Sequence, residues 1–141
     1  MSESIETRSH SSVSIGDKLP ALEIPLSTTL IVSTAIASRD YQDVHHDPKL
    51  AKERGSPDIF MNILTTNGFV GRFVTDWTGP GATLKKIDIR LGAPNYPGDT
   101  MTVEGAVTGK DDDAGTIEVS VRGANQLGDH VTGTVTISLP S

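Results

Sequence analysis

The second half of the chain contains one long helical pattern, followed directly by segments that alternate with a period of two residues. From Ile59 to Trp77, apolar side chains recur at steps of three and four residues, the spacing of one face of an α-helix. Gly68 and Gly71 fall inside this helix, and we interpret both as sites of close packing against a sheet. Gly79-Pro80-Gly81 then ends the pattern. A single long helix ahead of consecutive strands predicts the α+β class, with the helix laid against a sheet.

The chain beyond residue 81 predicts four antiparallel strands. Apolar and polar residues alternate there, as they do in strands with one buried face. Two clusters of turn residues, 111–115 and 125–129, separate the last three strands as hairpin turns. The apolar positions are Leu84, Ile87, Ile89 and Leu91; Met101, Val103, Gly105 and Val107; Ile117, Val119 and Val121; and Val131, Gly133, Val135, Ile137 and Leu139.

The first half of the chain gives shorter signals. Ser27–Arg39 opens with capping residues before an apolar run and predicts a helix, although its β-branched residues would also suit a strand. Pro48–Arg54 predicts a short helix, and Leu22–Ile24 predicts a short edge strand. Residues 1–13 are polar and aperiodic, and we expect them to form a flexible tail ahead of a single domain, residues 14–141.

Composition excludes several classes of protein. The 141 residues contain no cysteine, which excludes a disulfide framework, a thiolate nucleophile and a cysteine-bearing zinc site. The formal net charge of -6 argues against a nucleic-acid partner, because phosphate binding requires a basic face. No apolar run reaches the roughly 18 residues of a membrane-spanning helix, and Met1–Ser14 is too polar for a signal peptide. We therefore expect a cytoplasmic protein with no membrane or nucleic-acid partner.

Asp40–Asp47 carries the densest group of ionisable side chains. Two of the four histidines and three acids lie within these eight residues. An imidazole beside a carboxylate suits general acid–base chemistry near neutral pH, and an irregular loop can bring Asp40 and His45 to one point. The residues alone leave two other interpretations open. One is a solvated loop whose acids cap the helix Pro48–Arg54, and the other is a metal site formed by His and Asp ligands.

The stretch Ser38–Asp47 resembles the hydratase motif of the MaoC-like, R-specific enoyl-CoA hydratase family. In that motif a small residue is followed by Gly, Asp, any residue, Asn, Pro, an aliphatic residue, His, any residue and Asp. On this resemblance Asp40 matches the family's catalytic aspartate and His45 its catalytic histidine. The resemblance covers roughly Gly16 to Leu139 and implies a hotdog fold, in which an antiparallel sheet wraps a long central helix.

The chain departs from the family pattern at several positions. Arg39 stands in place of the motif glycine, Gln42 in place of the asparagine and Asp43 in place of the proline. The family's His-Gly at the start of the long helix is Met61-Asn62 here. In the family pattern, the backbone N–H of that glycine binds the thioester oxygen. The resemblance therefore makes Asn62 a candidate oxyanion donor, through its backbone N–H or its side-chain amide.

The resemblance implies an activity, a substrate and a partner. An enoyl-CoA hydratase adds water to a trans-2-enoyl-CoA, an acyl-CoA thioester, so coenzyme A would be part of the substrate, and we expect no cofactor and no metal. Gly55–Leu64, Val74–Trp77 and Leu127–His130 are similar to the small subunits of two-component actinobacterial hydratases of steroid side-chain β-oxidation. This likeness implies steroid side-chain or fatty-acyl β-oxidation. It also implies a second MaoC-like hotdog subunit as partner, with a homodimer when the chain is alone.

Two other functions remain open from the sequence. A hotdog acyl-CoA thioesterase would usually carry a carboxylate on or beside the long helix, and residues 62–75 contain none. A non-catalytic scaffolding hotdog subunit would have no need of both Asp40 and His45. His46 is expected to be a hydrogen-bonded neighbour or exposed, and His130, at a turn, is expected to be structural. Three cations are expected on a solvated face and are also candidates for contacts with CoA phosphates: Arg72, Lys85 and Lys86.

Overall fold

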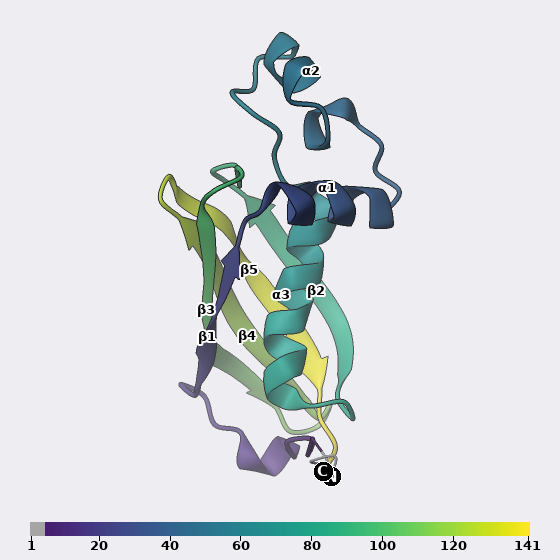
Figure 1. The fold of residues 1–141 in the computed structure, drawn as a ribbon. Coiled ribbons are helices and arrows are strands. Elements are labelled where there is room, and N and C mark those ends of the chain that lie inside the picture. Colours follow the sequence, from purple (N-terminus) through teal and green to yellow (C-terminus); the bar gives the residue numbers. More distant parts are fainter. Residues whose placement is uncertain (1–4) are drawn as a thin grey trace.

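The computed structural model describes residues 5–141, in which one long helix lies against a curved antiparallel sheet (Figure 1). The helices are α1 (Thr28–Ala37), α2 (Pro48–Glu53) and α3 (Ile63–Thr78), with the short 3₁₀ turns η1 (His10–Ser12) and η2 (Asp43–His45). The strands are β1 (Lys18–Pro25), β2 (Thr83–Leu91), β3 (Thr100–Asp111), β4 (Thr116–Asn125) and β5 (Gly128–Ser138).

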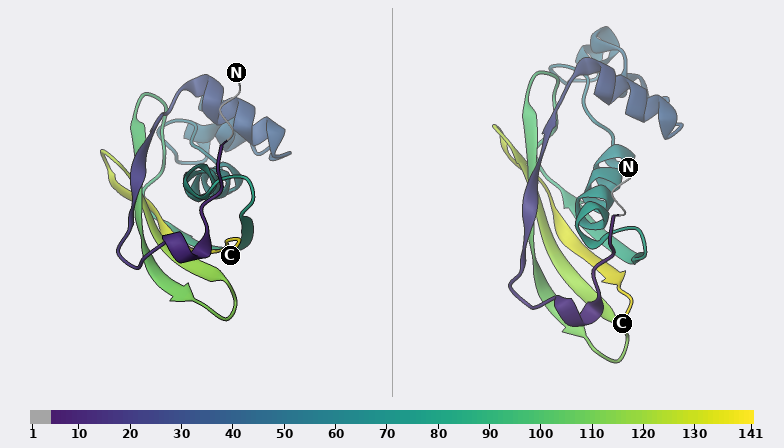
Figure 2. Two further views of the ribbon diagram at one scale, coloured as in Figure 1. Left: turned by 90° about the horizontal axis from the view of Figure 1, so that it is seen from below. Right: turned by 60° about the horizontal axis from the view of Figure 1, so that its bottom comes forward.

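The five strands form one sheet in the order β1-β3-β4-β5-β2, and every neighbouring pair is antiparallel. The four strands predicted after the long helix are confirmed, and the predicted edge strand lies in the C-terminal half of a longer β1. Figure 2 shows the sheet curving around α3. At Gly105 an added Cβ would approach the Phe73 ring to 2.9 Å, because helix and sheet lie in close contact there. This arrangement confirms the α+β class and the hotdog fold.

Helix α3 begins later than its apolar pattern predicts. Asn62 has extended backbone angles (φ -79, ψ 160), and its side-chain oxygen accepts a hydrogen bond from the Thr65 N–H, which caps the helix ahead of Ile63. Ile63 and Leu64 were expected on the buried face, yet they are 52% and 51% exposed. The buried places in the first turn belong instead to threonines whose hydroxyls have hydrogen-bond partners inside the protein.

The two glycines of α3 differ in what lies opposite them. An added Cβ at Gly71 would come within 3.3 Å of Ile87 and 3.6 Å of Leu84, so β2 packs on the helix here as predicted. An added Cβ at Gly68 would meet no described atom within 4 Å. The interpretation of Gly68 as a packing site was therefore wrong, because this side of the helix faces a groove rather than the sheet.

Residues 5–13 also differ from the expected flexible tail, while residues 1–4 of that predicted tail lie outside the described residues. Val13 is buried, and the backbone N–H of Arg8 donates to the Thr78 carbonyl at 2.8 Å. The Arg8 guanidinium stacks over the Trp77 ring at 4.4 Å. This segment packs because it offers donors to carbonyls at the C-terminal end of α3, which have no partner within the helix. In the described part of the chain, no helix is long and apolar enough to cross a membrane.

Candidate functional site

Helix α1 lies across the N-terminal end of α3, and the segment that connects the two helices projects beyond that end (Figure 1). Helix α1 forms as predicted, since the Ser27 hydroxyl accepts a hydrogen bond from the Leu30 N–H at 3.0 Å. Asp40 follows α1, His45 lies in η2, and Asn62 precedes α3. The structure brings these last three side chains together: His45 Nε2 lies 3.4 Å from Asp40 Oδ2, and Asn62 Nδ2 lies 3.1 Å from the same oxygen.

His45 is buried and is held in one tautomer by its surroundings. Its Nδ1 lies 2.7 Å from the Phe60 carbonyl oxygen, and because a carbonyl only accepts hydrogen bonds, Nδ1 carries the proton. The Phe60 ring meets the imidazole edge-on, with ring centroids 4.9 Å apart. In the neutral imidazole, Nε2 is therefore a hydrogen-bond acceptor that faces Asp40.

The Asp40 carboxylate is held in its ionised form. The Asn62 side-chain amide donates a hydrogen bond that lowers the pKa of Asp40; partial burial acts in the opposite direction, and the Gln42 N–H and the nearby His45 lower it further. The side chain is 20% exposed, so water can reach it. When His45 is neutral, its Nε2 and the ionised Asp40 carboxylate are two acceptors 3.4 Å apart. A single water molecule can donate one hydrogen to each of them.

Arg39, which stands at the motif's glycine position, adopts a backbone conformation that favours glycine. Its φ is +57°, in the left-handed region that costs a non-glycine residue about 1–2 kcal/mol. This conformation closes the end of α1, and the Asp40 N–H donates to the Ala35 carbonyl at 3.0 Å. With arginine at this position, Asp40 still lies beside His45.

The other two acids of the Asp40–Asp47 cluster have structural roles. Asp43 forms a two-pronged ion pair with Arg54, at 2.6 and 2.7 Å, and this contact lowers the pKa of Asp43. Asp47 caps α2 by accepting hydrogen bonds from two backbone N–H groups of its first turn. His46 is exposed. The capping interpretation is thus confirmed for Asp47, whereas Asp43 is paired with Arg54. The acid–base interpretation of Asp40 and His45 stays a prediction, which their 3.4 Å separation supports.

His130 is buried at the same end of α3, and both of its ring nitrogens are in use. Nδ1 lies 2.6 Å from the Ala93 carbonyl oxygen, and Nε2 lies 2.8 Å from the Thr66 hydroxyl. Burial lowers the pKa of His130, while the hydrogen bond to Ala93 opposes that effect. The structural role expected for this histidine agrees with these contacts.

A metal site in the cluster finds no support. Within residues 5–141, no group of three or more His, Cys, Asp or Glu side chains is placed to hold a metal ion. Among the candidates for phosphate contacts, Arg72 lies 3.2 Å from Asp76 and Lys86 lies 3.6 Å from Asp88. These two cations therefore already have acidic neighbours on the surface.

A groove of about 380 Å³ between α1 and α3 adjoins the site. The two features meet at Ser38, whose hydroxyl accepts a hydrogen bond from Asn62 Nδ2 at 2.9 Å. The sequence analysis missed this groove. Its signal was the pair of small residues Ala37 and Gly68 at exposed positions of the two helices. The lining residues are Thr34, Ala37, Ser38, Leu64, Thr65, Gly68, Phe69 and Arg72.

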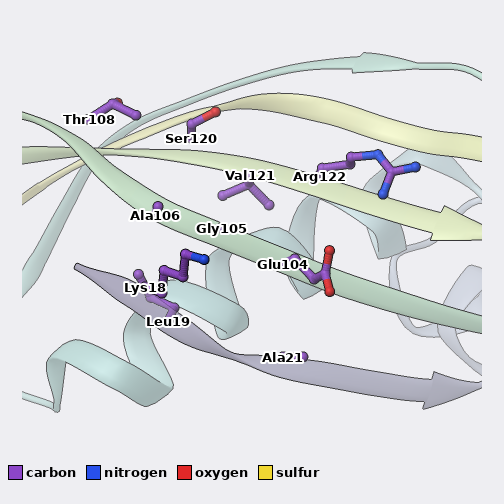
Figure 3. A pocket seen from close by; sticks show the side chains of 10 residues that line it. All are labelled: Lys18, Leu19, Ala21, Glu104, Gly105, Ala106, Thr108, Ser120, Val121 and Arg122. Carbon is purple, nitrogen blue, oxygen red and sulfur yellow. The ribbon is translucent and has the colours of Figure 1, made fainter. Parts of the chain in front are cut away.

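A second hollow, of about 480 Å³, lies on the sheet over β1, β3 and β4 (Figure 3). Its lining includes no histidine. Glu104 and Arg122 are direct cross-strand partners there, an ordinary pairing of opposite charges on a sheet. This hollow does not carry the chemistry of the Asp40–His45 pair, so it is not the candidate site.

Residues 11–126 match the family model described as "MaoC like domain". The chain belongs to the MaoC-like family. This confirms the resemblance derived from the Ser38–Asp47 motif. The roles of Asp40, His45 and Asn62 in this MaoC-like protein remain predictions supported by their geometry.

Individual relatives support the same assignment. The 3-oxo-4,17-pregnadiene-20-carboxyl-CoA hydratase beta subunit of Mycobacterium tuberculosis (strain ATCC 25618 / H37Rv) is 54% identical over 125 residues, 89% of this chain and 95% of that protein. A chain in the crystal structure of the ChsH1-ChsH2 complex from M. tuberculosis is 54% identical, with a TM-score of 0.87 over 89% of this chain and 98% of that one. The (R)-hydratase from A. caviae involved in PHA biosynthesis shares the fold at 24% identity, with a TM-score of 0.80 over 92% of this chain and 98% of that chain.

Proposed function

We propose that this MaoC-like chain is an enoyl-CoA hydratase subunit that adds water across the double bond of a trans-2-enoyl-CoA. The observation that carries the proposal is the Asp40–His45 pair, a carboxylate oxygen and an imidazole nitrogen 3.4 Å apart at the N-terminal end of α3. The relative that is 54% identical is named as a hydratase subunit, which supports the same activity.

In the proposed reaction, a single water molecule donates one of its hydrogens to Asp40 and its second hydrogen to His45. Its oxygen attacks the β-carbon, which is electrophilic because the thioester carbonyl withdraws electrons. The electron pair of the double bond moves toward the thioester oxygen as a proton passes from the water to Asp40 or His45. These two side chains then return a proton to the α-carbon, so the elements of water are added overall. Acid–base assistance of this kind contributes about 10²–10⁴-fold to the rate.

The start of α3 supplies the stabilisation that the developing enolate needs. The backbone N–H of Asn62 donates to no acceptor among the described residues, and it lies at the positive end of a 16-residue helix. A thioester oxygen placed there would accept this hydrogen bond as its negative charge grows. We therefore assign the oxyanion role of Asn62 to its backbone.

The acyl part of the substrate would lie in the groove between α1 and α3. Ala37, Leu64 and Phe69 make its walls largely apolar, and it opens beside Asp40. The name of the M. tuberculosis relative supports a steroid side-chain enoyl-CoA as the substrate. Coenzyme A is part of that substrate, and the reaction needs no cofactor or metal.

We further propose that a second hotdog subunit completes the active site. In the part of the chain that the structure describes, β2 is an edge strand, and Leu84 and Leu91 on it are 40% and 41% exposed. Ile63 and Leu64 are also exposed beside the site. The similar M. tuberculosis chain was solved in a ChsH1-ChsH2 complex. We expect a hetero-oligomer in the cytoplasm of the cell, and a homodimer when the chain is expressed alone.

The test measures hydration of a steroid and a short trans-2-enoyl-CoA through loss of the absorbance of the conjugated thioester. The purified chain is assayed alone and after co-expression with a second MaoC-like subunit from the same host. We expect hydration, faster for the steroid substrate when the partner is present. Release of free thiol without hydration would indicate a thioesterase. Full activity of the complex with Asp40→Asn in this chain would indicate a scaffold.

A further inference from the structure

The side chain of Asn62 has a partner for each hydrogen-bonding position that it offers. Its Oδ1 accepts from the backbone N–H of Thr65 at 3.0 Å and from the Thr65 hydroxyl. Its Nδ2 donates to the Ser38 hydroxyl at 2.9 Å and to Asp40 Oδ2 at 3.1 Å. A primary amide has two donor hydrogens and one oxygen with two lone pairs. The side chain is therefore saturated.

These contacts also fix which way the amide points. A backbone N–H only donates, so the atom that faces the Thr65 N–H is the amide oxygen, and the nitrogen faces Asp40. Asn62 is 2% exposed, which leaves the side chain little room to rotate. Its amide could reach a thioester oxygen only by releasing Ser38 or Asp40.

The Asp40 oxygen that receives this hydrogen bond is the one that faces His45. Asn62 Nδ2 and His45 Nε2 both approach Oδ2, at 3.1 and 3.4 Å, while Oδ1 accepts from the Gln42 N–H at 3.3 Å. We propose that Asn62 is a positioning residue, whose side-chain amide holds the Asp40 carboxylate against His45. The amide also keeps this carboxylate ionised, so that it can accept a hydrogen bond from the attacking water. This proposal deepens the proposed hydratase function and rests on it.

The charges around Asp40 support this role. The ionisable group that faces it is His45 from η2, whereas Ser38 at the end of α1 and Asn62 ahead of α3 are uncharged. Arg39, next to it in the chain, is exposed. The amide hydrogen bond is also the largest of the effects that lower the pKa of Asp40. A glycine at position 62, as in the family pattern, has no side chain to supply this contact.

The alternative is that Asn62 merely caps α3, and three substitutions separate the two roles. Asn62→Ser keeps a cap oxygen for the Thr65 N–H but loses the donor to Asp40. Asn62→Asp keeps the cap and the shape but puts a carboxylate where the donor was. Asn62→Ala loses both the cap and the donor. A residue that only caps the helix would make the serine variant behave like the wild type.

The kinetic experiment uses the active protein, with its partner subunit if the partner is required. We expect Asn62→Ser to lower kcat about 10- to 10²-fold with a smaller change in KM, the size of effect seen when a catalytic group is misplaced. The acidic limb of the pH–rate profile should move to higher pH, and further in Asn62→Asp because of like-charge repulsion. In an Asp40→Asn background, Asn62→Ser should cause no additional loss, because the two residues act as one unit.

A second measurement does not depend on activity. In protein with ¹³C-labelled aspartate carboxyls, the Asp40 resonance, assigned through Asp40→Asn, should titrate at higher pH in Asn62→Ser and Asn62→Ala than in the wild type. Asn62→Ala should unfold at a lower temperature than Asn62→Ser. This difference in unfolding temperature measures the contribution of the helix cap alone. An unmoved Asp40 titration in a folded serine variant would overturn the proposal. Absence of hydration by the wild type would instead refute the proposed function, whatever the titration shows.

Discussion

His45 and His130 are two buried histidines at the N-terminal end of α3, and they differ in the group that faces their second ring nitrogen. Each donates its Nδ1 hydrogen to a backbone carbonyl, at 2.7 Å to Phe60 and 2.6 Å to Ala93, so both are held in the same tautomer. The difference lies at Nε2, which faces a carboxylate in His45 and the Thr66 hydroxyl in His130. Burial and a fixed tautomer are therefore common to the proposed catalytic histidine and to the structural one. What distinguishes them is the group that faces Nε2.

The largest expected effect tests this difference directly. Asp40→Asn and His45→Ala should each lower kcat for enoyl-CoA hydration by at least about 10²-fold, the lower end for a lost acid–base group. His130→Gln should retain kcat within a few-fold at a temperature where it stays folded, since His130 does not face Asp40. Steady-state kinetics on the three folded variants decides the matter. Near-wild-type turnover in both Asp40→Asn and His45→Ala would refute the acid–base role of the two residues.

The second prediction extends the comparison to the two sides of α3, one facing the groove and the other the sheet. Gly68→Phe should fill the groove and raise KM for a steroid enoyl-CoA by about 10-fold or more, a typical cost of lost apolar contacts, with little change for a short enoyl-CoA. Gly68→Ala is the matched control. Its Cβ enters open space, so it should leave KM unchanged and stabilise the helix by about 0.5–1 kcal/mol. If Gly68→Phe changed KM equally for both substrates, the acyl chain would not bind in this groove.

The smallest effect concerns the pH dependence of stability. Because burial lowers the pKa of His130 below 6.5, the unfolded chain binds a proton more readily than the folded chain. The free energy of unfolding should fall as pH drops from about 6.5 toward the folded pKa, and this contribution should level off below it. His130→Gln should show a shallower fall across that window in urea unfolding at each pH. A fall of equal slope in wild type and variant would contradict the prediction.

Carboxylates do not disturb that comparison. The lowered pKa values of Asp40 and Asp43 mean that these groups stabilise the folded state above about pH 3.8 and lose this contribution as pH falls through their folded pKa values. Their contributions change below about pH 3.8, whereas the contribution of His130 begins to change near pH 6.5. They are also present in both proteins, so the difference between wild type and His130→Gln isolates the histidine.

The sequence determined the elements that depend on local pattern. Period-two alternation gave the strands β2 to β5, three- and four-residue spacing gave most of α3, and the motif gave Asp40 and His45 as a pair. Periodicity misplaced the start of α3, however. Ile63 and Leu64 fit the pattern as core residues because they are apolar. The pattern does not show that the hydroxyls of Thr65 and Thr66 have hydrogen-bond partners within the protein.

Only the tertiary structure decided how Asn62 and the two α3 glycines are used. Asn62 contacts Ser38 and Asp40, which precede it by 24 and 22 residues, so no local pattern predicts that its amide is saturated. Gly68 and Gly71 are identical in sequence terms, yet one faces a groove and the other β2. A side chain's chemistry is fixed by its type, but its availability depends on which distant groups the fold places within hydrogen-bonding distance.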